Sequence, residues 1–361
     1  MLPGGNDYND AVLVQTAAGE TPDLFWANRT VYPQFVEAGV FSPLDDLLAR
    51  DSNVNLDTFF PTSVAELVID GTLYGMPIMY HSGVSGLFYH KPLFDEAGVA
   101  YPDESWRYQD EFLDAARKIT RSDSNGIITA WGVQQTGYNP LTTIIYSFGG
   151  EILNESGSES LLTSEGTVEA IRFVRSLHRE HRVARAPGDG PEPNFAFPTG
   201  KVGMQLNGSW GMTPVQASLA DDEWSVAPVP MGPSGIRMPG EGAGAIWGIA
   251  RHSQNPEAAW TWLAYLASDE VQHKVMEMRT NFSSKPNVAR EYVADERLKA
   301  FVTALEEGHH RRSALPAGMS WGEHQQTVMR YVNNIFRGEA ADRTALLQAK
   351  ESIDAQLRAA R

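Results

Sequence analysis

The sequence predicts an α/β fold with mostly parallel sheets. Stretches with helical periodicity and short apolar runs alternate from one end of the chain to the other, which is the order that strand–helix–strand units produce. The chain has 361 residues, a length typical of two domains. Hydrophobic residues make up 42% of it and charged residues 20%, a balance that allows a sizeable core and excludes a disordered or fibrous protein.

Helices are predicted where apolar residues recur every three or four positions between end signals. Gly39 follows one such segment and suits a helix C-terminus, and Pro43 precedes the next. The predicted helices are residues 8–18, 32–38, 44–49, 61–69, 110–120, 164–180, 255–267, 268–279 and 323–337. Short apolar runs bounded by Gly or Pro predict strands at residues 24–27, 75–78, 86–90, 131–134, 202–206, 224–228 and 245–250.

Charge and composition exclude several classes of function. The 29 Lys and Arg residues against 45 Asp and Glu leave a net charge of −16, which disfavours binding to nucleic acid or to an acidic membrane surface. The chain has no Cys, so disulfides, thiolate metal sites and thiol catalysis are excluded. No apolar stretch reaches the roughly 20 residues of a membrane span, and the first residues show no signal peptide.

Sequence motifs for catalysis, metals or cofactors are weak throughout. Residues 83–86 and 208–211 both miss the spacing of a nucleophilic serine turn, and residues 235–248 contain no phosphate-binding loop. His178 and His181 stand three residues apart on a predicted helix, whereas a helical zinc motif needs four. We expect a solvated helix face there, and we expect neither a metal nor a cofactor.

Aromatic residues in loops are the strongest functional signal. Trp26, Tyr80, Trp210 and Trp321 each stand beside small or polar residues instead of inside a helical stripe. A flat indole can lie against the apolar face of a sugar ring, while amide, carboxylate or guanidinium groups pair with its hydroxyls. These loops therefore predict a carbohydrate-binding site.

A glycosidase would also gather aromatics around a sugar, and it needs two carboxyl groups at a fixed separation. Glu241, in a Gly-rich loop, is the acid most readily placed in a pocket, and no second acid accompanies it in the sequence. Binding without catalysis is the preferred interpretation, and a glycosidase-type enzyme remains the alternative.

Segments spread over almost the whole chain carry a family resemblance. They are residues 17–26, 38–46, 74–77, 87–98, 101–106, 197–204, 207–210 and 253–260. In this order and spacing they resemble the extracellular solute-binding proteins of sugar-type ABC importers, the group that includes the maltose-binding protein. The signal and the first strand–helix–strand segment of that family have no counterpart here, which predicts a first lobe truncated at its start.

The resemblance implies a two-lobed periplasmic-binding-protein-like fold of type II, with a hinge and a ligand cleft between the lobes. Lobe 1 is expected at residues 1–88 plus 246–306, and lobe 2 at 89–245 plus 307–361. The protein is expected to be a monomer without enzymatic activity that binds a mono- or oligosaccharide and delivers it to a membrane permease. Its expected location is extracytoplasmic, either periplasmic or as a cell-surface lipoprotein.

The resemblance also assigns ligand-binding residues. Trp26, Trp210 and Trp321 match positions that stack against sugars, and Tyr138 adds a further aromatic face. The neighbouring polar residues expected to serve hydroxyl groups are Asn28, Arg29, Tyr80, His81, Ser82, Asn207 and Glu241. Arg29 and His81 leave open an acidic sugar such as a uronate, and a non-sugar ligand such as a glycerophosphodiester or a polyamine is a further alternative.

Overall fold

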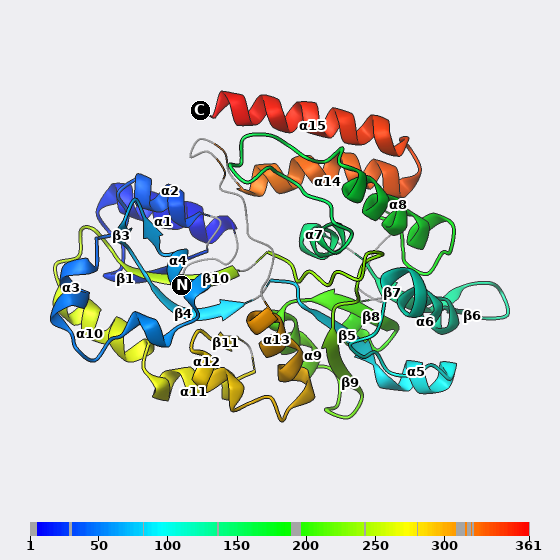
Figure 1. Ribbon diagram of the computed structural model, residues 1–361, viewed down its shortest axis with the longest axis horizontal. Coiled ribbons are helices and arrows are strands. Elements are labelled where there is room, and N and C mark those ends of the chain that lie inside the picture. The colour runs from blue at the N-terminus through cyan, green and yellow to red at the C-terminus, as the bar shows by residue number, and fades with distance from the viewer. Residues whose placement is uncertain are drawn as a thin grey trace. The chain divides into compact units, whose positions relative to one another are not determined.

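The computed structural model describes residues 6–28, 31–81, 83–135, 137–188, 196–241, 243–279, 281–307, 315, 319 and 321–360. The chain forms two compact units (Figure 1). The first comprises Met1–His81, Ala243–Tyr292 and Ser320–Gly322, and the second comprises Ser82–Gly242, Val293–Met319 and Glu323–Arg361. In the described part of the chain, no helix is both long and apolar enough to cross a membrane.

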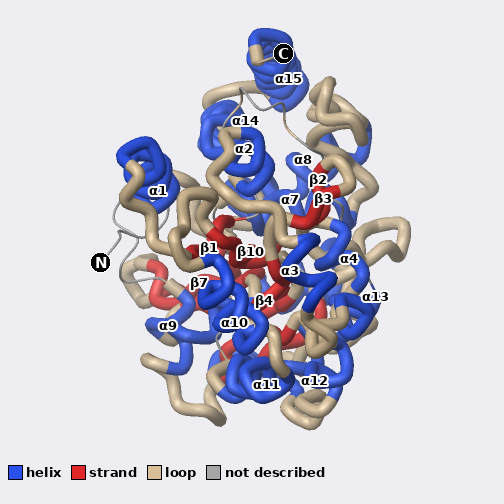
Figure 2. The backbone as a smooth tube through the Cα atoms, turned by 90° about the vertical axis from the view of Figure 1, so that its left-hand side faces the viewer, coloured by secondary structure: helices blue, strands red, loops and turns tan. Residues whose placement is uncertain are grey.

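The first unit contains a four-stranded sheet with the order β1-β10-β4-β11. The strands are β1 (Leu24–Asn28), β10 (Ala243–Ile249), β4 (Met76–His81) and β11 (Phe282–Ser283). Every pairing in this sheet is antiparallel, and β1, β10 and β4 lie side by side in Figure 2. The sheet therefore joins segments that are more than 160 residues apart in the sequence.

Helices and a short hairpin complete the first unit. Phe25 on β1 stacks on Phe41 with ring centroids 4.7 Å apart, and both belong to a buried cluster that includes Tyr32 and Trp260. The elements are α1 (Asn6–Ala18), α2 (Tyr32–Glu37), α3 (Asp45–Arg50), η1 (Leu56–Thr58), α4 (Pro61–Ala65), β2 (Val68–Ile69), β3 (Thr72–Leu73), α10 (Pro256–Leu266), α11 (Asp269–Glu277) and α12 (Pro286–Arg290).

The second unit contains a five-stranded sheet with the order β6-β7-β8-β5-β9. Its strands are β6 (Arg121–Ser122), β7 (Ile128–Gln134), β8 (Val202–Asn207), β5 (Gly86–His90) and β9 (Trp224–Pro228). Only the β7–β8 pair is parallel among them. All five residues of β5 are buried, because β5 has a strand on each side and helices against its faces.

Aromatic packing holds the second unit's sheet to its helices. Phe88 on β5 lies parallel to Trp224 at 5.9 Å and also contacts Phe301 on α13. Helices α8, α14 and α15 lie together over another part of this unit (Figure 1). The elements are α5 (Lys91–Ala97), η2 (Tyr108–Phe112), α6 (Leu113–Ile119), α7 (Tyr138–Ser147), α8 (Glu165–Arg179), η4 (Phe197–Thr199), η5 (Ser209–Gly211), α9 (Met212–Gln216), α13 (Glu296–Glu307), α14 (Trp321–Arg337) and α15 (Asp342–Ala359).

The α/β class predicted from the sequence is confirmed, but the prediction of mostly parallel sheets is wrong. Alternation of helices and strands along a chain does not set strand direction, and here the segments that return to each sheet from far away pair antiparallel. The helix predicted at 61–69 ends at Ala65, because a turn with positive φ at Asp70 and Gly71 makes the hairpin of β2 and β3. Helices α5, α7, α9, α12, α13 and α15 were not predicted.

The two compact units differ from the predicted lobes at residues 82–88, 243–245, 293–306 and 320–322, and the largest differences concern β5 and α13. Strand β5 lies in the second unit because it pairs with β8 and β9, although residues 86–88 were assigned to lobe 1. Helix α13 also lies in the second unit, where Phe301 packs on Phe88 and the Arg297 guanidinium lies over the Trp224 ring.

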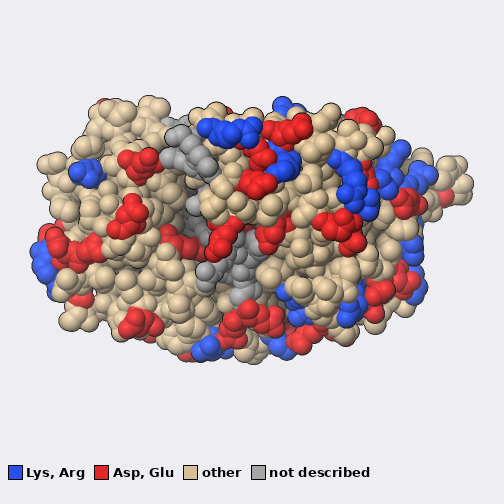
Figure 3. Space-filling view, turned by 45° about the horizontal axis from the view of Figure 1, so that its top comes forward, with Lys and Arg blue, Asp and Glu red and all other residues tan. Residues whose placement is uncertain are grey.

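Charged side chains are mixed over the surface that Figure 3 presents. Lys and Arg lie among Asp and Glu on this face, without the continuous basic stretch that a phosphate backbone attracts. Such a mixture of both signs, together with the net charge of −16, favours solubility.

Candidate ligand-binding site

The turn that follows β8 places an indole at the surface of the second unit. Strand β8 ends at Asn207, whose Oδ1 accepts the Gly208 N–H at 2.9 Å, and η5 then presents Trp210 with 38% of its surface exposed. A Cβ atom on Gly208 would overlap the six-membered ring of Trp210. The absence of a side chain at this position is what allows the indole to lie against the turn backbone.

The start of α7 places an aromatic ring in the same unit. Gly137, with a φ of +86°, precedes the helix, and Tyr138 is its first residue. The Tyr138 hydroxyl lies 3.4 Å from Nε2 of His324 on α14, and the two rings meet edge to face at 6.0 Å. Tyr138 is 5% exposed, so its ring is held in place by its surroundings.

These two elements meet at a cavity of about 250 Å³ that belongs entirely to the second unit. Three of the predicted ligand residues line it: Tyr138, Asn207 and Trp210. The other lining residues are Val84, Gly137, Asn139, Pro140, Gln205, Leu206 and Gln325. Two aromatic side chains and four primary amides thus surround one space, and none of these lining residues carries a charge.

This combination suits a neutral polyhydroxylated ligand. Each primary amide offers a carbonyl acceptor and two N–H donors, so it can pair with a hydroxyl group in either direction. An indole face supplies an apolar surface for the C–H groups of a ring. General acid–base chemistry on a sugar needs carboxyl groups, which the described lining of this cavity lacks.

Glu241 belongs to the second unit and is not among the residues that line this cavity. It is 8% exposed, and its Oε1 accepts the Tyr146 hydroxyl at 2.5 Å. Burial raises the pKa of Tyr146 well above its usual range, and the nearby Glu241 carboxylate raises it further. Because a raised pKa keeps the phenol protonated, Tyr146 remains a hydrogen-bond donor to this buried carboxylate.

Sheet register gathers three of the predicted residues at one end of the first unit's sheet. Asn28 is the last residue of β1 and pairs with Ala245, while Tyr80 and His81 end β4 opposite residues 244 and 243 of β10. The backbones of all three therefore lie beside the first residues of β10. Their side chains, and the whole of Arg29 and Ser82, lie outside the described residues.

Trp26 and Trp321 are less exposed than Trp210. Trp26 is half-buried on β1, and the Tyr8 ring stacks on it at 4.7 Å with the planes 13° apart. One face of that indole is therefore covered by a protein side chain. Trp321 begins α14 and is 4% exposed.

The prediction of a solvated face around His178 and His181 is wrong for His178. That residue is 5% exposed, and its ring packs against Phe336 at 5.2 Å. The position faces inward because α8 presents this side to α14 and α15, an arrangement that helical spacing alone does not reveal. His181 lies at the surface beside Arg117. Within the described residues, no group of His, Asp and Glu side chains is arranged to hold a metal ion.

Comparison with known proteins places the chain in a family. A family model described as bacterial extracellular solute-binding protein matches residues 3–273, about three quarters of the chain. The chain belongs to the bacterial extracellular solute-binding proteins.

Individual relatives align with most of the chain. A binding protein of Brucella abortus (strain 2308) is 25% identical over 359 residues, which span 95% of this solute-binding protein and 81% of the relative. The maltodextrin-binding protein MdxE of Bacillus subtilis is 23% identical over 303 residues, spanning 82% of this chain and 68% of MdxE. Both alignments extend well beyond a single motif.

A solved structure shows the same fold. The ABC substrate-binding protein Lmo0181 from Listeria monocytogenes, in complex with cycloalternan, superimposes with a TM-score of 0.84 at 22% identity. The match covers 99% of this chain and 90% of that protein. This solute-binding protein therefore has the two-lobed type II fold expected from its sequence.

Several lining residues of the cavity were not predicted. Gln205 stands two positions before Asn207 on β8, so the two-residue repeat of a strand places it on the same face and would have identified it. Asn139 and Pro140 directly follow Tyr138 in the sequence. Gln325 lies on α14, more than 110 residues after Trp210, and has no local signal in the sequence.

Proposed function

We propose that this protein is the substrate-binding component of an ABC carbohydrate importer and binds a neutral mono- or oligosaccharide without catalysing a reaction. The observation that supports this proposal most directly is the uncharged lining of the cavity around Trp210, with its aromatic rings and four primary amides. Two of the compared proteins bind carbohydrates according to their names, one a maltodextrin and the other cycloalternan.

Within the cavity, we assign different tasks to the two kinds of side chain. The indole of Trp210 and the ring of Tyr138 provide apolar surface for sugar rings, at about 0.5–1.5 kcal/mol for an aromatic contact beyond the area that it buries. Asn139, Gln205, Asn207 and Gln325 select for hydroxyl groups, because a buried amide without a partner costs about 1–3 kcal/mol. A ligand lacking hydroxyls would leave these amides unsatisfied.

The remaining predicted residues stay in the proposal as secondary contacts. In the first unit they are Trp26, Asn28, Arg29, Tyr80, His81 and Trp321, and in the second unit Ser82 and Glu241. A ligand that contacts both units would favour the closed state of the hinge, and its release to the permease would follow reopening. We assign Glu241 a supporting role, because its buried carboxylate is already engaged by Tyr146.

The family supports a proposal about the cellular setting. Its members are extracellular solute-binding proteins, and we propose that this chain acts outside the cytoplasm as a monomer beside its permease. A glycosidase activity is not proposed, since two carboxyl groups about 5–10 Å apart would have to flank the sugar.

The test is a thermal-shift screen against maltose, maltotetraose, cyclic and β-linked oligosaccharides, a uronate and a glycerophosphodiester, with tryptophan fluorescence in parallel. A ligand at 100 times its Kd adds about 2.7 kcal/mol to the folded state, which moves the melting temperature by several degrees. Trp210→Ala should reduce the shift. Trp262→Ala, a change of an indole that is 53% exposed on α10, is the matched control and should leave it unchanged.

Recovery of the ligand decides between binding and catalysis. Chromatography after prolonged incubation should return the oligosaccharide intact. A normal melt with no response to any carbohydrate would refute the proposed ligand class, and cleavage products would refute the absence of catalysis.

A further inference from the structure

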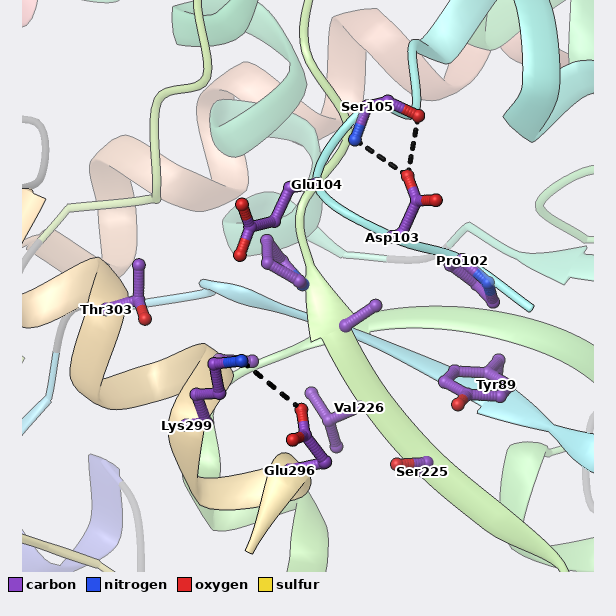
Figure 4. Close-up of a pocket in the computed structure, with 13 residues that line it drawn as sticks. Tyr89, Pro102, Asp103, Glu104, Ser105, Ser225, Val226, Glu296, Lys299 and Thr303 are labelled. Carbon is purple, nitrogen blue, oxygen red and sulfur yellow. Dashed lines mark hydrogen bonds and ion pairs between the residues drawn. The ribbon is translucent and has the colours of Figure 1, made fainter. Parts of the chain in front are cut away.

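A second and larger cavity lies at the free edge of β9 in the second unit. Its volume is about 490 Å³, within the range of 300–1,000 Å³ typical of ligand pockets. Strand β9 forms one wall, α13 a second, and residues 102–105 a third (Figure 4). It shares no lining residue with the cavity around Trp210.

The edge of β9 presents main-chain hydrogen-bonding groups to this space. The Lys91 N–H donates to the Glu223 C=O at 2.8 Å, just beyond the ladder in which β5 and β9 pair antiparallel. Since hydrogen-bonded and non-bonded pairs alternate in such a ladder, the Phe88–Val226 pair is a non-bonded one. The N–H and C=O of Val226 therefore point away from β5, toward the cavity side of the strand.

Val226 has no other main-chain partner in the described part of the chain. Its N–H and C=O make no hydrogen bond to any described residue outside the β5 ladder. Val226 itself lines the cavity. An unpaired N–H and C=O at a sheet edge form a template for one more strand.

Beyond the end of β9, the protein pairs residues 106–108 with Met231. The Met231 N–H donates to the Trp106 C=O at 2.8 Å, and the Tyr108 N–H donates to the Met231 C=O at 3.0 Å, in a parallel bridge. Residues 102–104 form no such bridge to 226–228. The Asp103 carboxylate accepts the Ser105 N–H at 2.8 Å, and the cavity lies between residues 102–105 and β9.

The walls of this cavity are acidic. Asp103, Glu104 and Glu296 contribute carboxylates, and Lys299 is the single cation among the lining residues. Lys299 lies 3.7 Å from Glu296 in an ion pair, so the Glu104 carboxylate on the opposite wall has no cation among them (Figure 4). A formal excess of two negative charges favours a basic occupant.

We propose that this cavity is a docking site for an extended basic peptide segment of a partner protein. The peptide adds a strand beside β9, with main-chain hydrogen bonds to Val226, and its Lys or Arg side chains reach Glu104 and Glu296. This is recognition by strand addition, in which main-chain bonds supply affinity and side-chain contacts supply specificity. It is independent of carbohydrate binding and concerns a different surface.

The test measures binding of a fluorescent acetyl-Thr-Arg-Val-Lys-Thr-amide by anisotropy. We expect saturable binding that weakens as salt is added, because the contacts with carboxylates are screened. Val226→Pro removes an N–H that faces away from β5 and replaces the buried side chain of Val226, and a proline is tolerated at such an edge position. It should weaken binding about tenfold, the effect of one lost hydrogen bond and its disturbed neighbours.

Charge and fold are controlled separately. Glu104→Lys should also weaken binding about tenfold, whereas Glu155→Lys, at an exposed turn of the same unit, should not. Both variants should keep the melting temperature of the parent protein. If Val226→Pro does not fold, the parent protein is tested with an analogue of the peptide that is methylated at all five residue nitrogens. This analogue keeps the charges of the peptide, and its residue nitrogens cannot donate hydrogen bonds.

Three results would overturn the proposal. The first is equal binding of the methylated analogue, which would show attraction to charge alone. The second is equal binding of acetyl-Thr-Glu-Val-Glu-Thr-amide, or displacement of the basic peptide by spermidine at a similar concentration. The third is no binding of the basic peptide at about 1 mM, the weak limit of useful recognition.

Discussion

The substitution Gly208→Ala should displace the Trp210 indole and leave the rest of the structure unchanged. Gly208 has a φ of −85° and extended backbone, so alanine fits the conformation without strain. Its Cβ would lie 2.5 Å from Cε3 of the indole and closer still to two other ring atoms. The nearest ring atoms must move by at least 1.2 Å to restore the 3.4 Å of ordinary contact.

The expected effect is a loss of affinity with little loss of stability. Trp210 is 38% exposed, so the ring can rotate outward without opening the core. Losing its stacking contact removes about 0.5–1.5 kcal/mol of binding free energy, a roughly 2- to 13-fold increase in Kd. The melting temperature without ligand should stay within about 3 °C of the parent, as for a surface change.

The assay is titration calorimetry with the sugar that gives the largest thermal shift, in a double-mutant cycle with Trp210→Ala. If displacement of the indole is the cause, Gly208→Ala has no further effect once the indole is absent. An equal loss of affinity in both backgrounds would refute the reasoning, since it would mean that the methyl group acts on the ligand or the backbone directly. Unchanged affinity in the parent background would refute the stacking role of Trp210.

Two further predictions concern buried polar groups. Tyr146→Phe removes the hydroxyl that donates to the buried Glu241 carboxylate at 2.5 Å. It should lower the free energy of unfolding by about 1–3 kcal/mol in urea titrations. A change below experimental error would show that the carboxylate does not depend on this donor. Burial lowers the pKa of His90 below its ordinary value of 6.5. The unfolded chain therefore binds a proton at His90 more readily than the folded chain does. The free energy of unfolding is unaffected by His90 above pH 6.5 and decreases progressively as the pH falls below 6.5. Melting curves between pH 7.5 and 5 should therefore show a weaker pH dependence in His90→Gln than in the parent, and parallel curves would contradict this assignment.

The local elements were predictable because their signals lie within short stretches. Residues 86–90 and 224–228 are apolar runs bounded by Gly or Pro, and the structure has strands with the same bounds at β5 and β9. Residues 202–206 were predicted one residue short of β8. Trp210 and Asn207 were identified together because both stand in one Asn-Gly-Ser-Trp turn, and the structure brings them to the same cavity.

Other features depended on partners far away in the sequence. The burial of His178 depends on α14 and α15, and the engagement of Glu241 depends on Tyr146, 95 residues earlier. Gln325 joins the cavity only because α14 packs near the start of α7.

The sequence by itself determined the turn that carries Asn207 and Trp210 and most of the local elements, because periodicity and turn residues depend on whether each position faces a core or solvent. The tertiary structure alone decided strand direction, the pairing of β1 with β10, and the open edge of β9. These features depend on which distant segments satisfy a strand's hydrogen bonds, and a strand's own residues are compatible with either direction and with several partners. The same physics explains why the turn at Trp210 was found from the sequence and the cavity beside Val226 was not.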